Sequence, residues 1–365
     1  EYILGGRRFL PQELSALVLR KLAQNAREAL EEEIEEAIIS VPAYFNDNQR
    51  CATRLAAQLA GLPVKRLINE PSAAALYYSQ SRAQSECRLV IDFGGGTLDV
   101  SVVDCFENMV EIVAIAGNNH LGGNDIDQAI AGYFCSQTGL VWSALDPQQQ
   151  RQLLALAERG KIALSSTGDR SCMLACEIGP ELYSVPLDSH ILSEICQPVF
   201  QKVREVIVRA VRDSEIPISA IQDVVLVGGS SQLGVFVDYL EELFSRRPTL
   251  AEYPEHTVAL GVGMYAGIKQ RDEDLREIVM TDVCPFSLGV ASYNDLQDLN
   301  PHMATLIQRS SILPARRTER FYTLSPNQRR IRLEIYQGEN YYASENLRLG
   351  ELTVSVPPDE PGKQF

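Results

Sequence analysis

The residues best suited to chemistry lie at positions 88–104, which read RLVIDFGGGTLDVSVVD. A short apolar run ends at Asp92, glycines and a threonine follow, and a second alternating run then begins, which predicts a β-hairpin whose turn has almost no side chains. Successive glycine N–H groups in such a turn make an anion-binding concavity. Carboxylates beside a bound phosphate would repel it, so Asp92 and Asp99 indicate a bridging Mg²⁺ or its waters. For this motif alone, an ordinary glycine-rich turn without a ligand is an equal alternative.

A second glycine turn lies far downstream, where residues 223–229 read DVVLVGG and SSQLGVFVDYLEELF follows. This pattern predicts a buried strand, a tight turn and an amphipathic helix, with Ser230 or Ser231 as the helix N-cap. Helix N-termini bind phosphate through free N–H groups and the helix dipole. Neither glycine run matches GxGxxG or GxxxxGK[ST], so Rossmann and P-loop folds are disfavoured. A strand–turn–helix without a ligand is again an alternative.

A third candidate is Glu70 in LINEPSAAAL, at the junction of a predicted strand and a helix. Its carboxylate could orient a water molecule for attack on a phosphate. It could also simply cap the helix, with Pro71 at a favoured first helical position, and its position alone slightly favours the cap.

The apolar periodicities indicate the elements that position these residues. Helices are expected at 13–33, 47–59, 72–79, 125–138, 148–164, 189–213, 232–244 and 256–268. Strands are expected at 37–41 and 110–115, and an antiparallel pair at 172–178 and 181–185. From residue 283 onward, prolines, turns and alternating runs indicate an all-β module.

Composition excludes several function classes. The 365 residues allow two or three domains, and the contents of 45% hydrophobic and 22% charged residues are typical of globular proteins. The net charge of -15 argues against nucleic acid binding, which needs clustered Lys and Arg. Eight cysteines without a CxxC pair and four histidines make a cysteine–histidine metal site improbable, and they favour free thiols in a reducing cytoplasm. We see no signal peptide or apolar run of about 18 residues, and so expect no membrane span.

Taken in order, six segments strongly resemble the DnaK-type seventy-kilodalton heat-shock chaperones: VPAYFNDNQR, INEPSAAAL, IDFGGGTLDVSV, GNNHLGGNDID, ERGKIALSS and VLVGGSS. The resemblance continues through TDVCPFSLGV and NQRRIRLEIYQGEN and covers nearly the whole chain. The segments VALG and IVMTD look most like the bacterial HscC branch.

This resemblance implies a partial α/β actin-like (ribonuclease-H-like) ATPase fold followed by a partial all-β substrate-binding sandwich. The implied domains are a remnant of nucleotide-binding lobe I (1–86), lobe II (87–254), a helix returning to lobe I (255–276), an interdomain linker (277–284) and a partial β substrate-binding domain (285–365).

Site residues follow from the resemblance position by position. The implied catalytic residues are Glu70, Asp92 and Asp99, with Asp92 holding Mg²⁺ through water. The implied nucleotide contacts are Gly94, Gly95, Gly96, Thr97, Gly122, Gly123, Glu158, Lys161, Ser165, Gly228, Gly229, Ser230, Gln232 and Glu255. Pro42, Arg50 and Asp282 are implied in interdomain coupling, and Val290, Tyr293, Leu324, Ile331 and Leu333 in peptide binding.

Each implied role has a structural alternative. Glu158 and Lys161 could form a surface ion pair, Arg50 could lie on a solvated helix face, and Ile331 and Leu333 could be sandwich core. Gln232 stands where the family often has an arginine, and it cannot supply the same cation–π contact with a base. Asn124 stands where the family has an acid.

The expected function is that of an ATP-dependent chaperone, with ATP or ADP and Mg²⁺ as cofactors. The expected partners are unfolded or extended peptides, with a J-domain co-chaperone as a possible addition, in the cytoplasm. The family's first phosphate hairpin (DLGTT type) and its catalytic lysine do not occur, so we expect an internal fragment or truncated product with impaired ATPase activity. The alternatives are a non-catalytic partner- or peptide-binding fragment and, disfavoured by the linker and β-module, a sugar kinase or actin-like filament protein.

Overall fold

The computed structural model describes residues 2–79, 86–106, 109–166, 171–270, 278–293, 300–323 and 325–357. The chain folds into two units that are described separately. Unit 1 comprises Glu1–Ile39, Tyr44–Leu67 and Thr281–Phe365, and unit 2 comprises Ser40–Ala43 and Ile68–Met280. Within the described residues, no helix is both long and apolar enough to cross a membrane.

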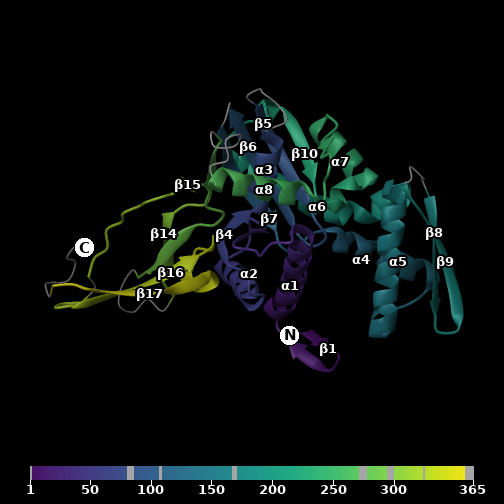
Figure 1. Ribbon diagram of the computed structural model, residues 1–365, viewed down its shortest axis with the longest axis horizontal. Coiled ribbons are helices and arrows are strands. Elements are labelled where there is room, and N and C mark those ends of the chain that lie inside the picture. The colour runs from purple at the N-terminus through teal and green to yellow at the C-terminus, as the bar shows by residue number, and fades with distance from the viewer. Residues whose placement is uncertain are drawn as a thin grey trace. The chain divides into compact units, whose positions relative to one another are not determined.

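Unit 2 is built on a mixed sheet in which β10 lies parallel to both β11 and β5, while β5, β6 and β7 are antiparallel neighbours. β5 is buried along nearly its whole length because helices cover the sheet: α3 packs against β5, β6 and β7, and α6 packs against β6 and β7 (Figure 1). The strands are β5 (Glu86–Phe93), β6 (Leu98–Phe106), β7 (Met109–Asn118), β10 (Asp223–Val227) and β11 (Thr249–Leu250).

The helices of unit 2 enclose one large core. The rings of Phe93 and Phe200 both pack on Phe236, with centroids 4.7 and 5.7 Å away. A hairpin of β8 (Ser171–Ile178) and β9 (Glu181–Asp188) lies along α5, with its alternate side chains buried (Figure 1). The helices are α3 (Glu70–Ser79), α4 (Gly123–Thr138), α5 (Pro147–Ser166), α6 (Ser189–Ser214), α7 (Gly234–Phe244) and α8 (Thr257–Gln270), with short 3₁₀ turns η1 (Trp142–Ala144), η2 (Ile218–Ala220) and η3 (Gly229–Gln232).

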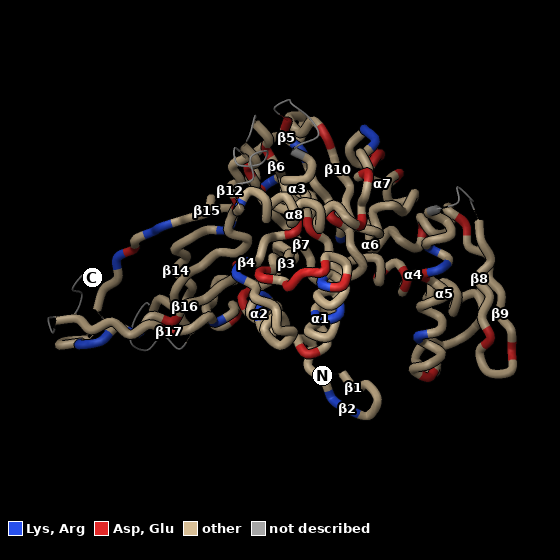
Figure 2. The backbone as a smooth tube through the Cα atoms, viewed as in Figure 1, with Lys and Arg blue, Asp and Glu red and all other residues tan. Residues whose placement is uncertain are grey.

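Unit 1 contains a hairpin, two helices and a β-module. α2 begins with a capping box, in which Asn46 Oδ1 accepts from Gln49 N at 3.0 Å and Gln49 Oε1 accepts from Asn46 N at 2.9 Å. Five glutamates crowd the segment 31–36 between α1 and β3 (Figure 2). The elements are β1 (Tyr2–Leu4), β2 (Arg7–Phe9), α1 (Pro11–Leu30) and α2 (Asp47–Leu59); β3 (Ala37–Val41) and β4 (Val64–Asn69) form a two-stranded sheet where the two units divide.

The β-module of unit 1 is an antiparallel sheet with strand order β14-β13-β16-β17, together with the antiparallel pair β12–β15. Its small core includes Met303 and Tyr336. The ring of Phe286 lies 4.7 Å from that of Tyr44. The elements are β12 (Val279–Val283), β13 (Leu288–Ser292), β14 (His302–Ile307), β15 (Ile312–Leu313), β16 (Arg330–Gln337), η4 (Ala343–Glu345) and β17 (Leu347–Ser355).

One sequence expectation, the N-cap of the helix after β10, is wrong in detail. Neither Ser230 nor Ser231 caps α7, because both lie in η3 and the N-cap is Leu233. Most of the segment expected as a linker forms strand β12, whose Asp282 and Val283 pair with β15. The antiparallel pair predicted at 172–185 is confirmed, and all eight cysteines are free thiols.

Candidate functional site

The turn between β5 and β6 presents backbone N–H groups. Gly94 N donates to Thr97 O at 3.0 Å, which closes the turn. At the start of α4, Gly123 N donates to Gly94 O at 3.0 Å and Asn124 N donates to Gly95 O at 2.7 Å. Among the described residues, no hydrogen-bond acceptor is found for the N–H groups of Gly95 and Gly96. These two donors are therefore available to an anion.

Close backbone approach requires glycine at two places around this turn. A Cβ on Gly122 would overlap Gly96 N and lie 2.5 Å from Gly95 C. Gly228 has φ +87°, and a Cβ there would lie 2.6 Å from both Asp92 Oδ1 and Phe93 O. The backbone at the N-terminus of α4 and the backbone of the turn after β10 therefore both pack closely against the end of β5 and the turn that follows it.

These elements enclose a pocket of about 340 Å³. α5 supplies four lining residues spaced so that they share one face of the helix. Gln232 Nε2 donates to Glu255 Oε1 at 3.3 Å across one wall. The lining residues are Gly95, Asn124, Glu158, Lys161, Ile162, Ser165, Gly229, Ser230, Gln232, Leu233 and Glu255.

Three carboxyl groups lie near one another at the end of the sheet. Asp92, the penultimate residue of β5, is directly opposite Asp99 in β6, and Glu70 is the first residue of α3. Burial, and to a lesser extent the charges of Asp92 and Asp99, raise the pKa of Glu70 to about 8. Burial also raises the pKa of Asp92 to about 6. A cation would favour the charged forms of all three groups.

Direct ligation by these groups has little support, since within the described ranges no three His, Cys, Asp or Glu side chains are placed to hold a metal ion together. A hydrated Mg²⁺, contacted through water, fits the arrangement better, because Mg²⁺ usually keeps several of its waters.

The carboxyl cluster predicts a pH dependence of stability. Because the folded pKa of Glu70 is raised from 4.5 to about 8, its contribution to stability is present below about pH 4.5 and is lost as the pH rises through about 8. Without Mg²⁺, we expect Glu70→Gln to be on the order of 2–4 kcal/mol more stable than the wild type at about pH 9 and nearly equal at about pH 5. Urea denaturation measures this, and parallel pH curves for the two proteins would contradict it.

The residues predicted for interdomain coupling and peptide binding are not among the residues that line this pocket. Pro42 follows β3, Arg50 Nε on α2 donates to Phe45 O at 3.0 Å, and Asp282 lies on β12. In the β-module, Val290 is 4% exposed and Tyr293 is 43% exposed. Ile331 and Leu333 lie on β16. Leu324 falls outside the described residues.

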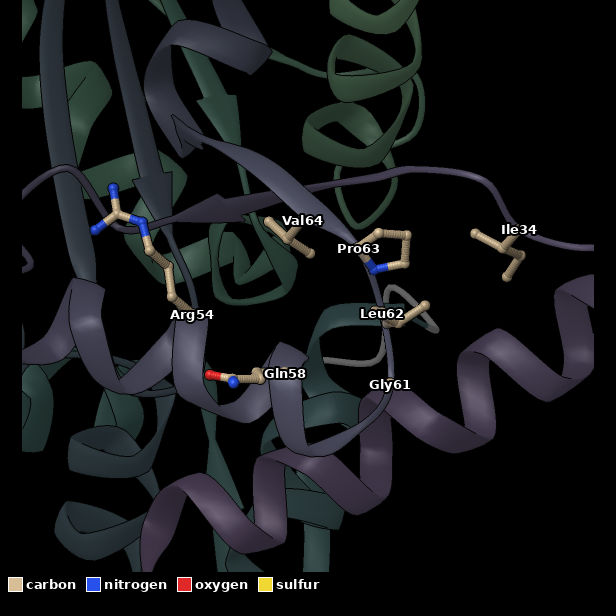
Figure 3. Close-up of a pocket in the computed structure, with 7 residues that line it drawn as sticks. All are labelled: Ile34, Arg54, Gln58, Gly61, Leu62, Pro63 and Val64. Carbon is tan, nitrogen blue, oxygen red and sulfur yellow. The ribbon is translucent and has the colours of Figure 1, made fainter.

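A second hollow, of about 680 Å³, lies in unit 1 (Figure 3). Arg54 and Gln58 approach it from α2 and Val64 from β4. Its turn offers few donors, because Gly61 N and Leu62 N already donate to Gln58 O and Ala57 O at 3.0 Å, and Pro63 has no N–H. The turn of this hollow therefore does not present a pair of available N–H groups as the turn in unit 2 does, although Arg54 lines it.

Sequence reasoning did not assign Asn124, Ile162 and Leu233 to the pocket. Ile162 follows Glu158 by four residues and precedes Ser165 by three, so helical spacing could have found it. Leu233 gives no such signal. It reaches the pocket because the 3₁₀ turn η3 precedes it, whereas the sequence predicted that a regular helix would begin at residue 232.

A family model and several curated relatives match this chain. The family model described as Hsp70 protein matches residues 1–364. Chaperone protein dnaK3 of Thermosynechococcus vestitus is 36% identical over 97% of this chain and 52% of its own length. Chaperone protein DnaK of Thermus thermophilus is 36% identical over 98% of this chain and 58% of its own length. Heat shock 70 kDa protein 7, chloroplastic, of Arabidopsis thaliana is 35% identical over 98% of this chain and 49% of its own length. The chain thus spans about half the length of these relatives.

Proposed function

Because the chain belongs to the Hsp70 family, we propose that it binds ATP or ADP with Mg²⁺ in the pocket of unit 2 and forms part of an ATP-dependent molecular chaperone. The observation that carries the proposal is the pair of available N–H groups on Gly95 and Gly96, at a turn bordered by three carboxyl groups. Amides suit a polyphosphate, and carboxylates suit the hydrated cation that accompanies it.

Each group has a distinct role in this proposal. When bound, Mg²⁺ would neutralise charge on the phosphoryl group being transferred. Asp92 would hold the waters of the ion, with Asp99 supporting it, and Glu70 would orient the attacking water. We expect steady-state hydrolysis to be slow, because Lys161 is the one cationic side chain among the described lining residues and it is already paired with Asp127.

The β-module is proposed to bind extended apolar peptides. The partners Ile331–Val354 and Leu333–Leu352 place four apolar side chains on one face of β16 and β17. Leu352 is 54% exposed and Val354 is 39% exposed, so a peptide could reach this face. Four further points remain predictions: that ATP controls peptide binding, that a J-domain protein is a partner, that the chain belongs to the HscC branch, and that the domain boundaries are those given above.

Gly95→Val tests nucleotide binding in the pocket. A Cβ on Gly95 meets no atom within 4 Å, so valine should be tolerated by the fold and should project into the space where phosphate would lie. We expect a loss of ADP·Mg²⁺ affinity of about 100-fold or more, with the unfolding midpoint unchanged. Isothermal titration and thermal unfolding measure the two quantities. Affinity equal to that of the wild type would place the ligand elsewhere.

A non-catalytic, peptide-binding role is the alternative, and the exposed apolar face of β16 and β17 is the observation that favours it. Two measurements would support this alternative over the first proposal. A labelled apolar peptide would bind the chain equally with and without ADP·Mg²⁺, and isothermal titration of the chain with ADP·Mg²⁺ would give no heat.

A further inference from the structure

One side chain beside the glycine turn has no part in the roles above. Asn124 is the second residue of α4, and it lines the pocket of unit 2. Its backbone N–H donates to Gly95 O at 2.7 Å, which fixes the residue to the turn. Its side-chain Nδ2 lies 3.5 Å from the point where a Cβ on Gly96 would stand. The amide group therefore lies next to the two N–H groups of Gly95 and Gly96 that are available to an anion.

The fold itself gives this amide group no task. Asp125 caps the start of α4, because its Oδ2 accepts from Gly122 N at 2.8 Å. The Asn124 side chain is exposed, and among the described residues no hydrogen-bond partner is found for it. An aspartate in its place would suit the helix better, because a negative charge in the first turn interacts favourably with the helix dipole. Helix stability therefore does not explain an asparagine at this position.

The charges around the pocket explain the asparagine better. Glu158 and Glu255 line the pocket, and the ammonium group of Lys161 is compensated by Asp127 at 2.7 Å. A polyphosphate therefore gains little from net charge in this pocket and depends on neutral N–H donors. An acid at position 124 would add a negative charge beside the turn, whereas an amide adds two N–H donors. Because the amide group can rotate by half a turn, an anion can be met by its –NH₂ end.

We propose, on the basis of the proposed nucleotide site, that Asn124 is a specificity-determining residue whose side-chain amide donates to the same phosphate group as the N–H groups of Gly95 and Gly96. A hydrogen bond to a charged phosphate oxygen is stronger than one to a neutral acceptor, so this third donor favours a ligand that carries phosphate at the turn. Because the family that this chain resembles has an acid at this position, the donor is particular to this chain.

Three variants separate a donor to phosphate from other contacts. We expect Asn124→Ala to weaken ADP·Mg²⁺ binding by about tenfold in isothermal titration, because one charge-assisted hydrogen bond is lost. We expect Asn124→Asp, which has nearly the same shape, to weaken it by about 50-fold or more, because repulsion is added to that loss. Gln128→Glu adds the same charge at an exposed position one turn further along α4, outside the pocket lining, and should bind normally.

Thermal unfolding supplies a second readout, which a purely structural role would not produce. Asn124→Asp should unfold at the same temperature as the wild type or at a higher one, because the helix dipole favours the added charge. The variant that binds the ligand most weakly is thus expected to be at least as stable as the wild type.

The outcomes separate this inference from the proposed function. If the wild type does not bind ADP·Mg²⁺, the proposed nucleotide site fails, and the inference fails with it. If the wild type binds and Asn124→Ala binds equally well, the inference fails alone. It also fails if Asn124→Asp binds as well as Asn124→Ala or better, because a carboxylate would then be accepting from a hydroxyl group or contacting the cation. Equal losses in Gln128→Glu and Asn124→Asp would show that the added charge acts at a distance, which overturns the inference as well.

Discussion

Replacing Gly122 by alanine is expected to abolish measurable nucleotide binding. The added Cβ would overlap Gly96 N and would lie 2.5 Å from Gly95 C, so the turn or the start of α4 must move by about 1 Å. Gly122 has φ -174°, which is extended backbone that any residue adopts, so the conflict is with the neighbouring turn alone. Because the proposed phosphate donors are N–H groups of that same turn, a shift of this size should cost at least about 100-fold in ADP·Mg²⁺ affinity.

Gly132 supplies the matched control on the same helix. A Cβ there meets no atom within 4 Å, and Gly→Ala within a helix should raise the unfolding free energy by up to about 1 kcal/mol. We expect Gly132→Ala to bind ADP·Mg²⁺ normally in isothermal titration. Normal binding by Gly122→Ala would show that the 94–97 turn does not hold the ligand.

The sequence predicts elements well where local signals agree. The strand at 37–41 and the helix at 47–59 are confirmed with the same bounds, because Asn46 caps the helix and Gly61, at φ +75°, follows its end. The α/β actin-like fold of the nucleotide-binding part is also confirmed, by the family match and the mixed sheet. These predictions rest on ordered motifs and periodicity, which are properties of the chain itself.

The sequence does not predict what depends on distant partners. Strand β12 forms where a linker was expected, because its pairing with β15 is set by residues about 30 positions away. Asp127 is the last residue of the recognised segment GNNHLGGNDID but gave no signal of its own, since its relation to Lys161 appears only when α4 and α5 pack together. The predicted carboxyl residues do meet, yet the raised pKa of Glu70 comes mainly from burial, which a sequence does not contain.

The second large effect is expected at Gly261, where α8 crosses α3 (Figure 1). A Cβ at this position would overlap the backbone carbonyl of Ala73, so the two helices can pack as they do only with glycine there. No flexible side chain can give way, and the helices must separate. We therefore expect Gly261→Ala to lower the free energy of unfolding by about 3 kcal/mol or more, measured by urea denaturation.

The displacement should also reach the carboxyl cluster, because Glu70 begins the helix that Ala73 belongs to. In any Gly261→Ala protein that remains folded, hydrolysis should therefore fall further than ADP·Mg²⁺ affinity, since the pocket itself is lined by other elements. Gly263→Ala is the control on the same helix, because its Cβ would meet no atom within 4 Å and the substitution should be neutral or stabilising. Equal unfolding free energies for the two variants would mean that α3 and α8 do not pack this closely, and the placement of Glu70 beside Asp92 would lose its support.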